Sequence, residues 1–178
     1  MTPTLRALRD LAWSRLEAGV RDRDAPARTL TLATIGAEGP EARSLVLRAV
    51  DRDAGTLDLH ADAASAKVAE IGADPRASVH LWDPGASLQV RLRGVVAVLT
   101  GPEADAAWDR VPEAARANYG GAPAPGRPIE QPGAHQPGAE RGRFAVLRLR
   151  ARELEVLCLA GPHLRAVFGR GRDRWLAP

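Results

Sequence analysis

Short segments of alternating apolar and polar residues, separated by turn sequences, occupy residues 28–99 and constrain the fold more than any other feature. The alternation has the two-residue period of a β-strand with one buried face. These segments are 28–35, 41–50, 56–61, 77–82 and 87–99. The sequences GAEGP, DRDAG and DPGA lie between them and favour tight turns, so neighbouring strands are predicted to pair as hairpins.

The rest of the chain adds few regular elements. Apolar residues at helical spacing predict helices at 4–20, 65–73 and 102–110. Two closing strands are predicted at 143–150 and 154–159, before a partly helical tail at 162–178. A parallel βαβ fold needs regular helical crossovers, which this order lacks. The sequence therefore predicts one mainly β (α+β) domain, 1–178, with antiparallel strands in a barrel or a sandwich.

Composition excludes several function classes. The net charge is only +3, basic and acidic residues are interleaved, and aromatic residues make up 4% of the chain, so nucleic-acid binding is not expected. No apolar run reaches the roughly 20 residues of a membrane span, and a single cysteine, Cys158, permits no internal disulfide. We therefore expect a cytoplasmic protein without a membrane partner. The four histidines, His60, His80, His135 and His163, lack metal-ligand spacing, so no metal site is expected.

The most unusual local feature is the lysine at the start of the second predicted helix. Lys67 is the only lysine in the chain, and a helix N-terminus ordinarily favours acidic residues because it carries partial positive charge. A bound phosphate reverses that preference. Together with Ser65, and with Arg43 and Ser44 on a nearby strand, Lys67 is predicted to form a phosphate site. The alternative is a pair of solvated charges beside a helix cap.

Three further features carry weaker predictions. Gln89 shares a strand face with Arg91 and Arg93, which fits either an amide facing a flavin or pyrimidine edge or the polar outer face of an edge strand. His60 follows a strand beside the predicted phosphate site, where it is either a ligand contact or a surface histidine. The Gly/Pro-rich segment 117–142 lacks periodicity and is predicted to be a long loop that covers a site, wraps a second subunit or is disordered.

Four segments together resemble the pyridoxamine 5'-phosphate oxidase-like family of FMN-binding split barrels, in its FMN-binding branch. They are RSLVLRAVD at 43–51, LHADAASAK at 59–67, DPRASVHLWDPGASLQVRLRG at 74–94 and LEVLCLAGPHLRAVF at 154–168. The resemblance implies a six-stranded antiparallel split β-barrel with flanking helices. It also implies a homodimer with FMN at the subunit interface and a small-molecule substrate.

The resemblance assigns residues to the cofactor and to the substrate. The cofactor-binding positions are Arg43, Ser44, Leu45, Val46, Arg48, His60, Ala61, Ser65, Lys67 and Gln89. Substrate contacts are expected from Arg48, His163 and Arg165. In this comparison Ser65 and Lys67 meet the phosphate, Arg43 lies near the phosphate end, and Gln89 hydrogen-bonds the flavin.

The chain also departs from the family pattern. Leu157 replaces a tryptophan, Val167 replaces a flavin-contacting arginine, and Ala66 replaces an arginine of the phosphate segment. The tyrosine, arginine and serine that hold the substrate phosphate have no match, since Tyr119 lies too far along the chain. These exchanges argue against vitamin B6 oxidation. The expected function is an FMN-dependent oxidoreductase; the alternatives are a non-catalytic flavin- or haem-binding protein and a deazaflavin-dependent reductase of the same barrel class.

Overall fold

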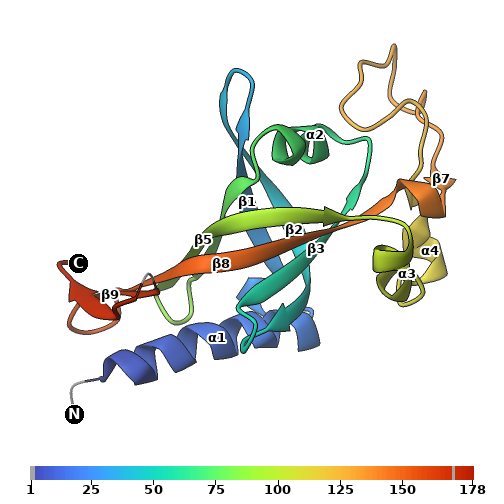
Figure 1. Ribbon diagram of the computed structural model, residues 1–178. Coiled ribbons are helices and arrows are strands. Elements are labelled where there is room, and N and C mark those ends of the chain that lie inside the picture. The colour runs from blue at the N-terminus through green and yellow to red at the C-terminus, as the bar shows by residue number, and fades with distance from the viewer. Residues whose placement is uncertain (1–2, 170) are drawn as a thin grey trace.

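A computed structural model describes residues 3–169 and 171–178 and contains a closed six-stranded antiparallel β-barrel (Figure 1). The barrel strands are β1 (Thr29–Gly36), β2 (Gly39–Asp51), β3 (Thr56–Asp62), β4 (Arg76–Asp83), β5 (Leu88–Leu99) and β8 (Phe144–Cys158). Their order is β8-β3-β2-β1-β4-β5, and β5 pairs with β8 to close the ring. This confirms the predicted split barrel and decides the earlier choice between a barrel and a sandwich.

The barrel interior is filled by the apolar residues of the alternating pattern. Leu30 and Leu32 of β1, Leu57 and Leu59 of β3, and the inward residues of β5 are almost fully buried, while the intervening positions face outward. Because successive side chains of a strand point to opposite faces, one alternating sequence supplies both the core and an outer face free for other contacts.

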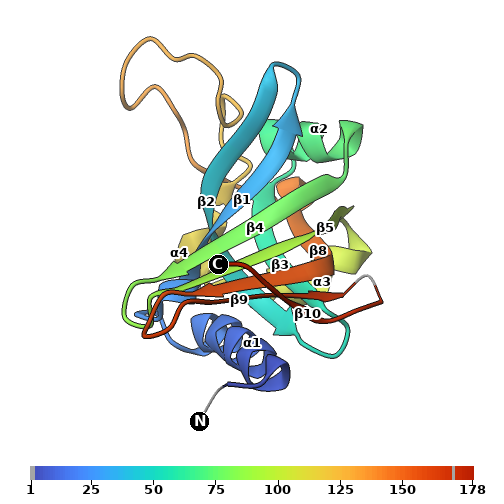
Figure 2. The same ribbon diagram turned by 90° about the vertical axis from the view of Figure 1, so that its left-hand side faces the viewer.

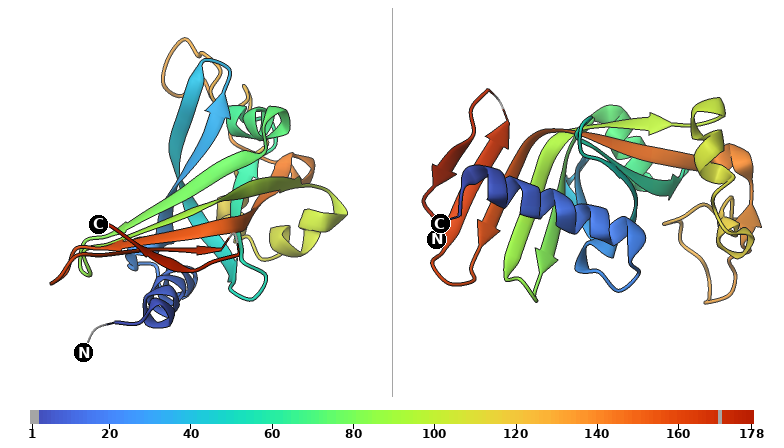
Figure 3. Two further views of the ribbon diagram at one scale, coloured as in Figure 1. Left: turned by 60° about the vertical axis from the view of Figure 1, so that its left-hand side comes forward. Right: turned by 90° about the horizontal axis from the view of Figure 1, so that it is seen from below.

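Helices cover parts of the barrel and its ends. They are α1 (Leu5–Arg21), α2 (Ala66–Ala73), α3 (Pro102–Trp108) and α4 (Glu113–Arg116), with 3₁₀ turns at Pro26–Arg28 and Arg141–Arg143. Helix α1 lies across the strands on the underside of the barrel (Figure 3) and buries Leu8, Ala12 and Leu16 against them. None of the described helices is both long and apolar enough to span a membrane.

The C-terminal part differs from the prediction in two ways. The two predicted closing strands are one continuous strand, β8, whose pairing with β5 shifts register between Arg93 and Gly94. A Cβ atom at Gly94 would lie 2.0 Å from the carbonyl oxygen of Arg150, which explains the glycine at this position. The tail is not helical: it forms β9 (Leu164–Gly169) and β10 (Arg174–Leu176), which extend the sheet beyond β8.

A second, smaller core supports the long loop. Trp108, Tyr119, Phe144 and Val146 pack together beneath α3 and α4, and the Tyr119 and Phe144 rings meet edge to face at 4.9 Å. The loop contains one short parallel pair, β6 (Asn118–Tyr119) and β7 (Gly138–Ala139), and its middle is exposed. Figure 2 shows the loop extending away from the barrel. It is therefore a surface excursion anchored at its base, as its lack of periodicity predicted.

Candidate functional site

An open pocket of about 340 Å³ lies where β2, the end of β3, the start of α2 and the loop after α4 meet. We call it the β2–β3 pocket. Its lining residues are Ser44, Leu45, Val46, Arg48, His60, Ala61, Asp62, Ser65, Lys67, Asn118, Tyr119 and Pro125. Eight of the ten positions predicted to bind a cofactor are among them. The structure thus brings together these eight positions, of which the first, Ser44, and the last, Lys67, are 23 positions apart in the sequence.

A bulge in β2 places Arg48 in this pocket. The pairing between β2 and β3 shifts register between Leu47 and Ala49, so Arg48 is the extra residue of the longer strand. Its guanidinium hydrogen-bonds the Tyr119 side chain, while its buried Nε has no partner in the described chain. Sequence reasoning placed Tyr119 too far along the loop to contribute. The return of the loop to β3 brings it into the pocket.

His60 lies beside Arg48 and is held as a neutral imidazole. Burial and the positive charge of Arg48 lower the pKa of His60 to about 4, although Asp58 opposes them. The ring meets the edge of Phe144 at 4.7 Å. Its buried Nδ1 has no hydrogen-bond partner in the described residues. A neutral imidazole with an unpaired nitrogen at a pocket wall fits a ligand contact better than a surface histidine.

The start of α2 forms the opposite end of the pocket. The buried hydroxyl of Ser65 donates to the carbonyl oxygen of Asp62 at 2.7 Å, so it does not cap the helix. The first turn of α2 contains no acidic residue and has no side-chain cap. Lys67 is half-buried there, and burial, followed by the charge of Arg43, lowers its pKa. Uncapped backbone N–H groups beside a half-buried ammonium fit an anion such as a phosphate.

Arg43, the fourth residue of the predicted phosphate site, is not among the residues that line this pocket. Its Nη2 lies 2.8 Å from Glu70 of α2, and its Nη1 donates to the hydroxyl of Thr34. Glu70, three positions after Lys67, forms an ion pair with Arg43, and this pair joins α2 to the barrel. Lys67 is therefore the cation at this end of the pocket. In the sequence, Glu70, one helical turn after Lys67, was the feature that could have indicated the pairing of Arg43.

Asp62 also lines the pocket and was not predicted. Its carboxylate accepts the Gly120 and Ala64 N–H groups at 2.8 Å, and its Oδ1 also accepts Nε and Nη2 of Arg143 at 3.0 and 2.8 Å. Burial works to raise the pKa of Asp62, but these hydrogen bonds and the Arg143 charge hold it below the ordinary value. Asp62 therefore joins the base of the long loop to the barrel, and it brings Tyr119 to the pocket.

Gln89 and the two C-terminal substrate candidates lie outside the pocket. Gln89 sits on β5 opposite Trp82 and Leu157, and His163 is exposed in the turn between β8 and β9. The pocket adjoins the beginning of β8, whereas His163 lies beyond its end. Fifteen residues of strand separate the two regions by up to about 50 Å. One copy of the chain therefore does not bring His163 to the pocket.

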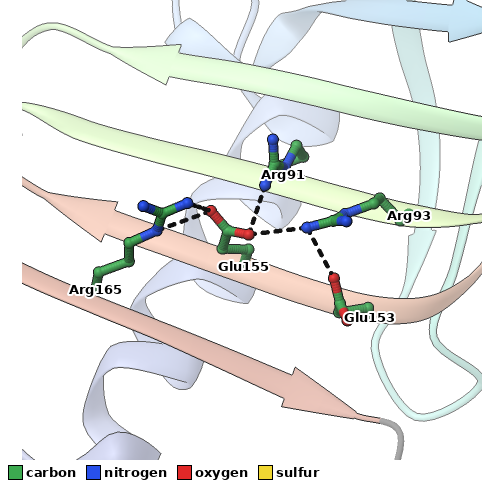
Figure 4. Close-up of polar contacts among 5 residues, drawn as sticks. All are labelled: Arg91, Arg93, Glu153, Glu155 and Arg165. Carbon is green, nitrogen blue, oxygen red and sulfur yellow. Dashed lines mark hydrogen bonds and ion pairs between the residues drawn. The ribbon is translucent and has the colours of Figure 1, made fainter. Parts of the chain in front are cut away.

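Arg165 belongs to an ion cluster on the outer face of the sheet, shown in Figure 4. The buried carboxylate of Glu155 accepts from Arg165 at 2.8 and 3.1 Å, from Arg91 at 2.5 Å and from Arg93 at 3.0 Å. Arg93 also contacts Glu153 at 3.0 Å. We call these five residues the Glu155 cluster. The predicted polar face of β5 thus exists, but its arginines are paired within the chain.

No group of His, Cys, Asp and Glu side chains within residues 3–169 and 171–178 is arranged to hold a metal ion. Cys158 is half-buried at the end of β8, packed against the barrel core. Among the groups that line the β2–β3 pocket, Arg48, Lys67, a neutral His60 and Tyr119 are the candidates for contact with an anionic ligand.

A sequence model described as pyridoxamine 5'-phosphate oxidase matches residues 17–158, which is most of the chain. The chain therefore belongs to the pyridoxamine 5'-phosphate oxidase family, as the four sequence segments predicted. The match ends at Cys158, so only part of the fourth segment lies within it.

Individual relatives refine this comparison. Pyridoxine/pyridoxamine 5'-phosphate oxidase from Pseudomonas paraeruginosa is 34% identical over 88 residues, which is 49% of this chain and 40% of that enzyme. The chain thus matches less than half the length of this curated relative. Among solved structures, a pyridoxamine 5'-phosphate oxidase-related, FMN binding protein from Nostoc punctiforme is similar over the whole of both chains, with a TM-score of 0.77 and 28% identity. PhzG from Burkholderia lata, in complex with tetrahydrophenazine-1-carboxylic acid, shares the fold, with a TM-score of 0.75 at 19% identity over 95% of this chain and 91% of its own.

Proposed function

We propose that the β2–β3 pocket binds FMN and that the protein is an FMN-dependent oxidoreductase acting on a small molecule. The observation that carries the proposal is the meeting of eight predicted cofactor positions in one pocket, with a half-buried lysine and an uncapped helix N-terminus at one end. The similar Nostoc protein, described as FMN binding, supports the same choice of cofactor.

The residues present fit the two ends of FMN. Lys67 and the N–H groups at the start of α2 would hold the phosphate, and the β2 segment Ser44–Val46 would contact the flavin. Bound flavin supplies the redox chemistry. Arg48 and Tyr119 donate hydrogen bonds at the far wall, where positive charge favours an anionic reduced ring or an anionic substrate. His60 remains neutral beside them near pH 7, because its pKa is lowered to about 4.

We further propose that the working unit is a homodimer in the cytoplasm. Gln89, His163 and Arg165 lie outside the pocket of their own chain. A second copy facing the outer surface of β5, β8 and β9 brings such residues to a pocket of its partner. Sedimentation of the purified protein with and without FMN tests this arrangement, and a monomer in both states contradicts it.

The first experiment is a visible absorbance spectrum of the purified protein, followed by titration of the flavin-free form with FMN, haem and a deazaflavin. Saturable FMN uptake with flavin absorbance bands supports the proposal. Preferential binding of haem or of a deazaflavin supports one of the two alternative functions and overturns the choice of FMN. Turnover with NAD(P)H or oxygen then separates an oxidoreductase from a non-catalytic flavin carrier.

Lys67→Ala tests the phosphate end of the pocket. Removing a charge-assisted contact to a phosphate is expected to raise the Kd for FMN by about 10- to 100-fold. The matched control is Arg127→Ala, which removes an exposed positive charge from the long loop. An unchanged Kd in Lys67→Ala, with circular dichroism showing an intact fold, contradicts the assignment.

A further inference from the structure

A second pocket, of about 200 Å³, adjoins the far wall of the β2–β3 pocket and is lined by three arginines. Arg28 comes from the 3₁₀ turn before β1, Arg48 from the β2 bulge, and Arg110 from the turn after α3. Arg48 and His60 line both this pocket and the β2–β3 pocket. Arg48 and His60, each with a buried nitrogen (Nε and Nδ1) that lacks a hydrogen-bond partner in the described residues, therefore form the wall that the two pockets share.

The second pocket continues into a third, of about 330 Å³, along the outer face of β3 and β8. The two have Ala49, Asp58 and Arg110 in common, and the third adds Arg148 and Arg150 of β8. We call this continuous surface, lined by Arg28, Arg48, Arg110, Arg148 and Arg150, the arginine groove. The combined volume of its two pockets is within the range of about 300–1,000 Å³ that is typical of small-molecule sites.

The charge of the arginine groove is not balanced by the chain. Its lining holds five arginines and two aspartates, a net charge of +3, because the low pKa of His60 leaves that residue neutral. Both aspartates already have partners: Asp58 accepts a bidentate contact from Arg148 at 2.7 and 2.8 Å, and Asp51 accepts the Ala54 N–H at 2.9 Å.

The other four arginines have no acidic partner. The ion pairs of the described chain include none for Arg28, Arg48, Arg110 and Arg150. Arg28 and Arg48 also repel each other: burial, and after it the positive charge of Arg48, lower the pKa of the Arg28 guanidinium. Cations gathered at one surface without counter-charges are stabilised when an anion binds between them.

We propose that the arginine groove binds an elongated small polyanion, a molecule with at least two phosphate or carboxylate groups, as the substrate of the flavin site. The unpaired charges are spread along the groove: Arg28 and Arg48 line one end, Arg110 the part common to the two pockets, and Arg150 the other end, beside the neutral Asp58–Arg148 pair. A ligand with separated anionic groups matches this spacing better than a single anion does. Arg48 and His60 then face the part of the ligand nearest the β2–β3 pocket. This assignment of substrate class rests on the proposed function.

The test is isothermal titration of the FMN-loaded protein at low salt with tripolyphosphate, citrate and inorganic phosphate. Loading with FMN keeps the probe out of the phosphate end of the β2–β3 pocket. Tripolyphosphate or citrate is expected to bind at least about tenfold more tightly than phosphate, and whichever binds more tightly identifies the anionic group. Equal affinity for phosphate and for both longer anions overturns the proposal.

Variants locate the binding. Arg110→Gln and Arg150→Gln are each expected to weaken tripolyphosphate binding about tenfold, whereas the control Arg127→Gln leaves it unchanged. Two groove variants protect the test against a local folding defect in one of them. Unchanged binding in both overturns the proposal, as does an equal loss in the Arg127→Gln control, which indicates attraction to overall charge.

Flavin uptake separates this inference from the proposed function. FMN binding without polyanion binding leaves the proposed function standing and overturns the groove assignment. In a protein that does not take up FMN, tripolyphosphate binding that depends on Arg110 and Arg150 supports the groove as an anion site and removes its link to a flavin. A change in flavin absorbance on adding tripolyphosphate is expected if the ligand reaches Arg48.

Discussion

Two groups of arginines lie on the outer face of the same barrel and are used in opposite ways. In the Glu155 cluster, three arginines surround one carboxylate whose side chain is 4% exposed, and a second glutamate completes the pairing. In the arginine groove, four arginines have no acidic partner within residues 3–169 and 171–178. The comparison shows that the function of an arginine is defined by the acids near it. Paired arginines stabilise the sheet, and unpaired ones are available to a ligand.

The largest effect is expected when the Glu155 cluster is disrupted. Glu155→Gln leaves Arg91, Arg93 and Arg165 around an uncharged amide, and loss of one partner of a buried ion pair is costly. Since these arginines are about one-third to one-half exposed, solvent screens part of the loss, and we expect about 2–3 kcal/mol less free energy of unfolding. Urea unfolding measures the change, with the exposed loop variant Glu130→Gln as control. A loss below about 0.5 kcal/mol contradicts the pairing.

An intermediate effect is expected at His60, in the wall shared by the β2–β3 pocket and the arginine groove. The pKa of His60 is about 4 in the folded chain and 6.5 ordinarily, so between these values the unfolded chain binds a proton that the folded chain does not. The free energy of unfolding therefore falls as the pH is lowered from 6.5 to 4 and rises as the pH is raised. His60→Phe keeps an aromatic ring beside Phe144 and should flatten this dependence. His163→Gln, at an exposed turn, should leave it unchanged.

The smallest effect is expected at the unpaired arginines of the arginine groove. Arg110→Gln removes an exposed cation that has no acidic partner, so the free energy of unfolding should change by no more than about 0.5 kcal/mol. The measurement of interest is the difference in the free energy of unfolding between Arg110→Gln and Glu155→Gln. Urea unfolding of both variants distinguishes a charge used for folding from a charge available to a ligand. A loss of 2 kcal/mol in Arg110→Gln, equal to that in Glu155→Gln, removes the distinction.

Most of the barrel could be predicted because its elements are defined locally. Alternating residues and turn sequences located β1 to β5 to within a few residues, and the helical spacing located α1. The single strand β8 was predicted as two because the charged sequence RARE, 150–153, interrupts the apolar pattern at the point where the strand bulges. Strands β9 and β10 were missed since each is short and gains its stability by pairing at the edge of the sheet.

The candidate site was predictable where a resemblance or a local anomaly indicated it. Lys67 at a helix start was such an anomaly, and the structure places it in the β2–β3 pocket. The pairing of Arg43 with Glu70 and the position of Tyr119 depend on how distant segments meet. The spacing of residues in the sequence does not determine such contacts. The arginine groove was missed for the same reason, because its arginines come from four separate elements.

The closing strand has a consequence for how the chain reaches its native state. Strand β8 pairs with β5 on one edge and with β3 on the other, although both precede it by more than 40 residues, so the ring closes only after residue 143 has been synthesised. Until then β3 and β5 are open edges, which can pair with other chains. Pairing between segments so distant in the sequence also slows folding. The intervening segment 117–142 is rich in glycine and proline, which are disfavoured inside strands, so it competes poorly for either edge.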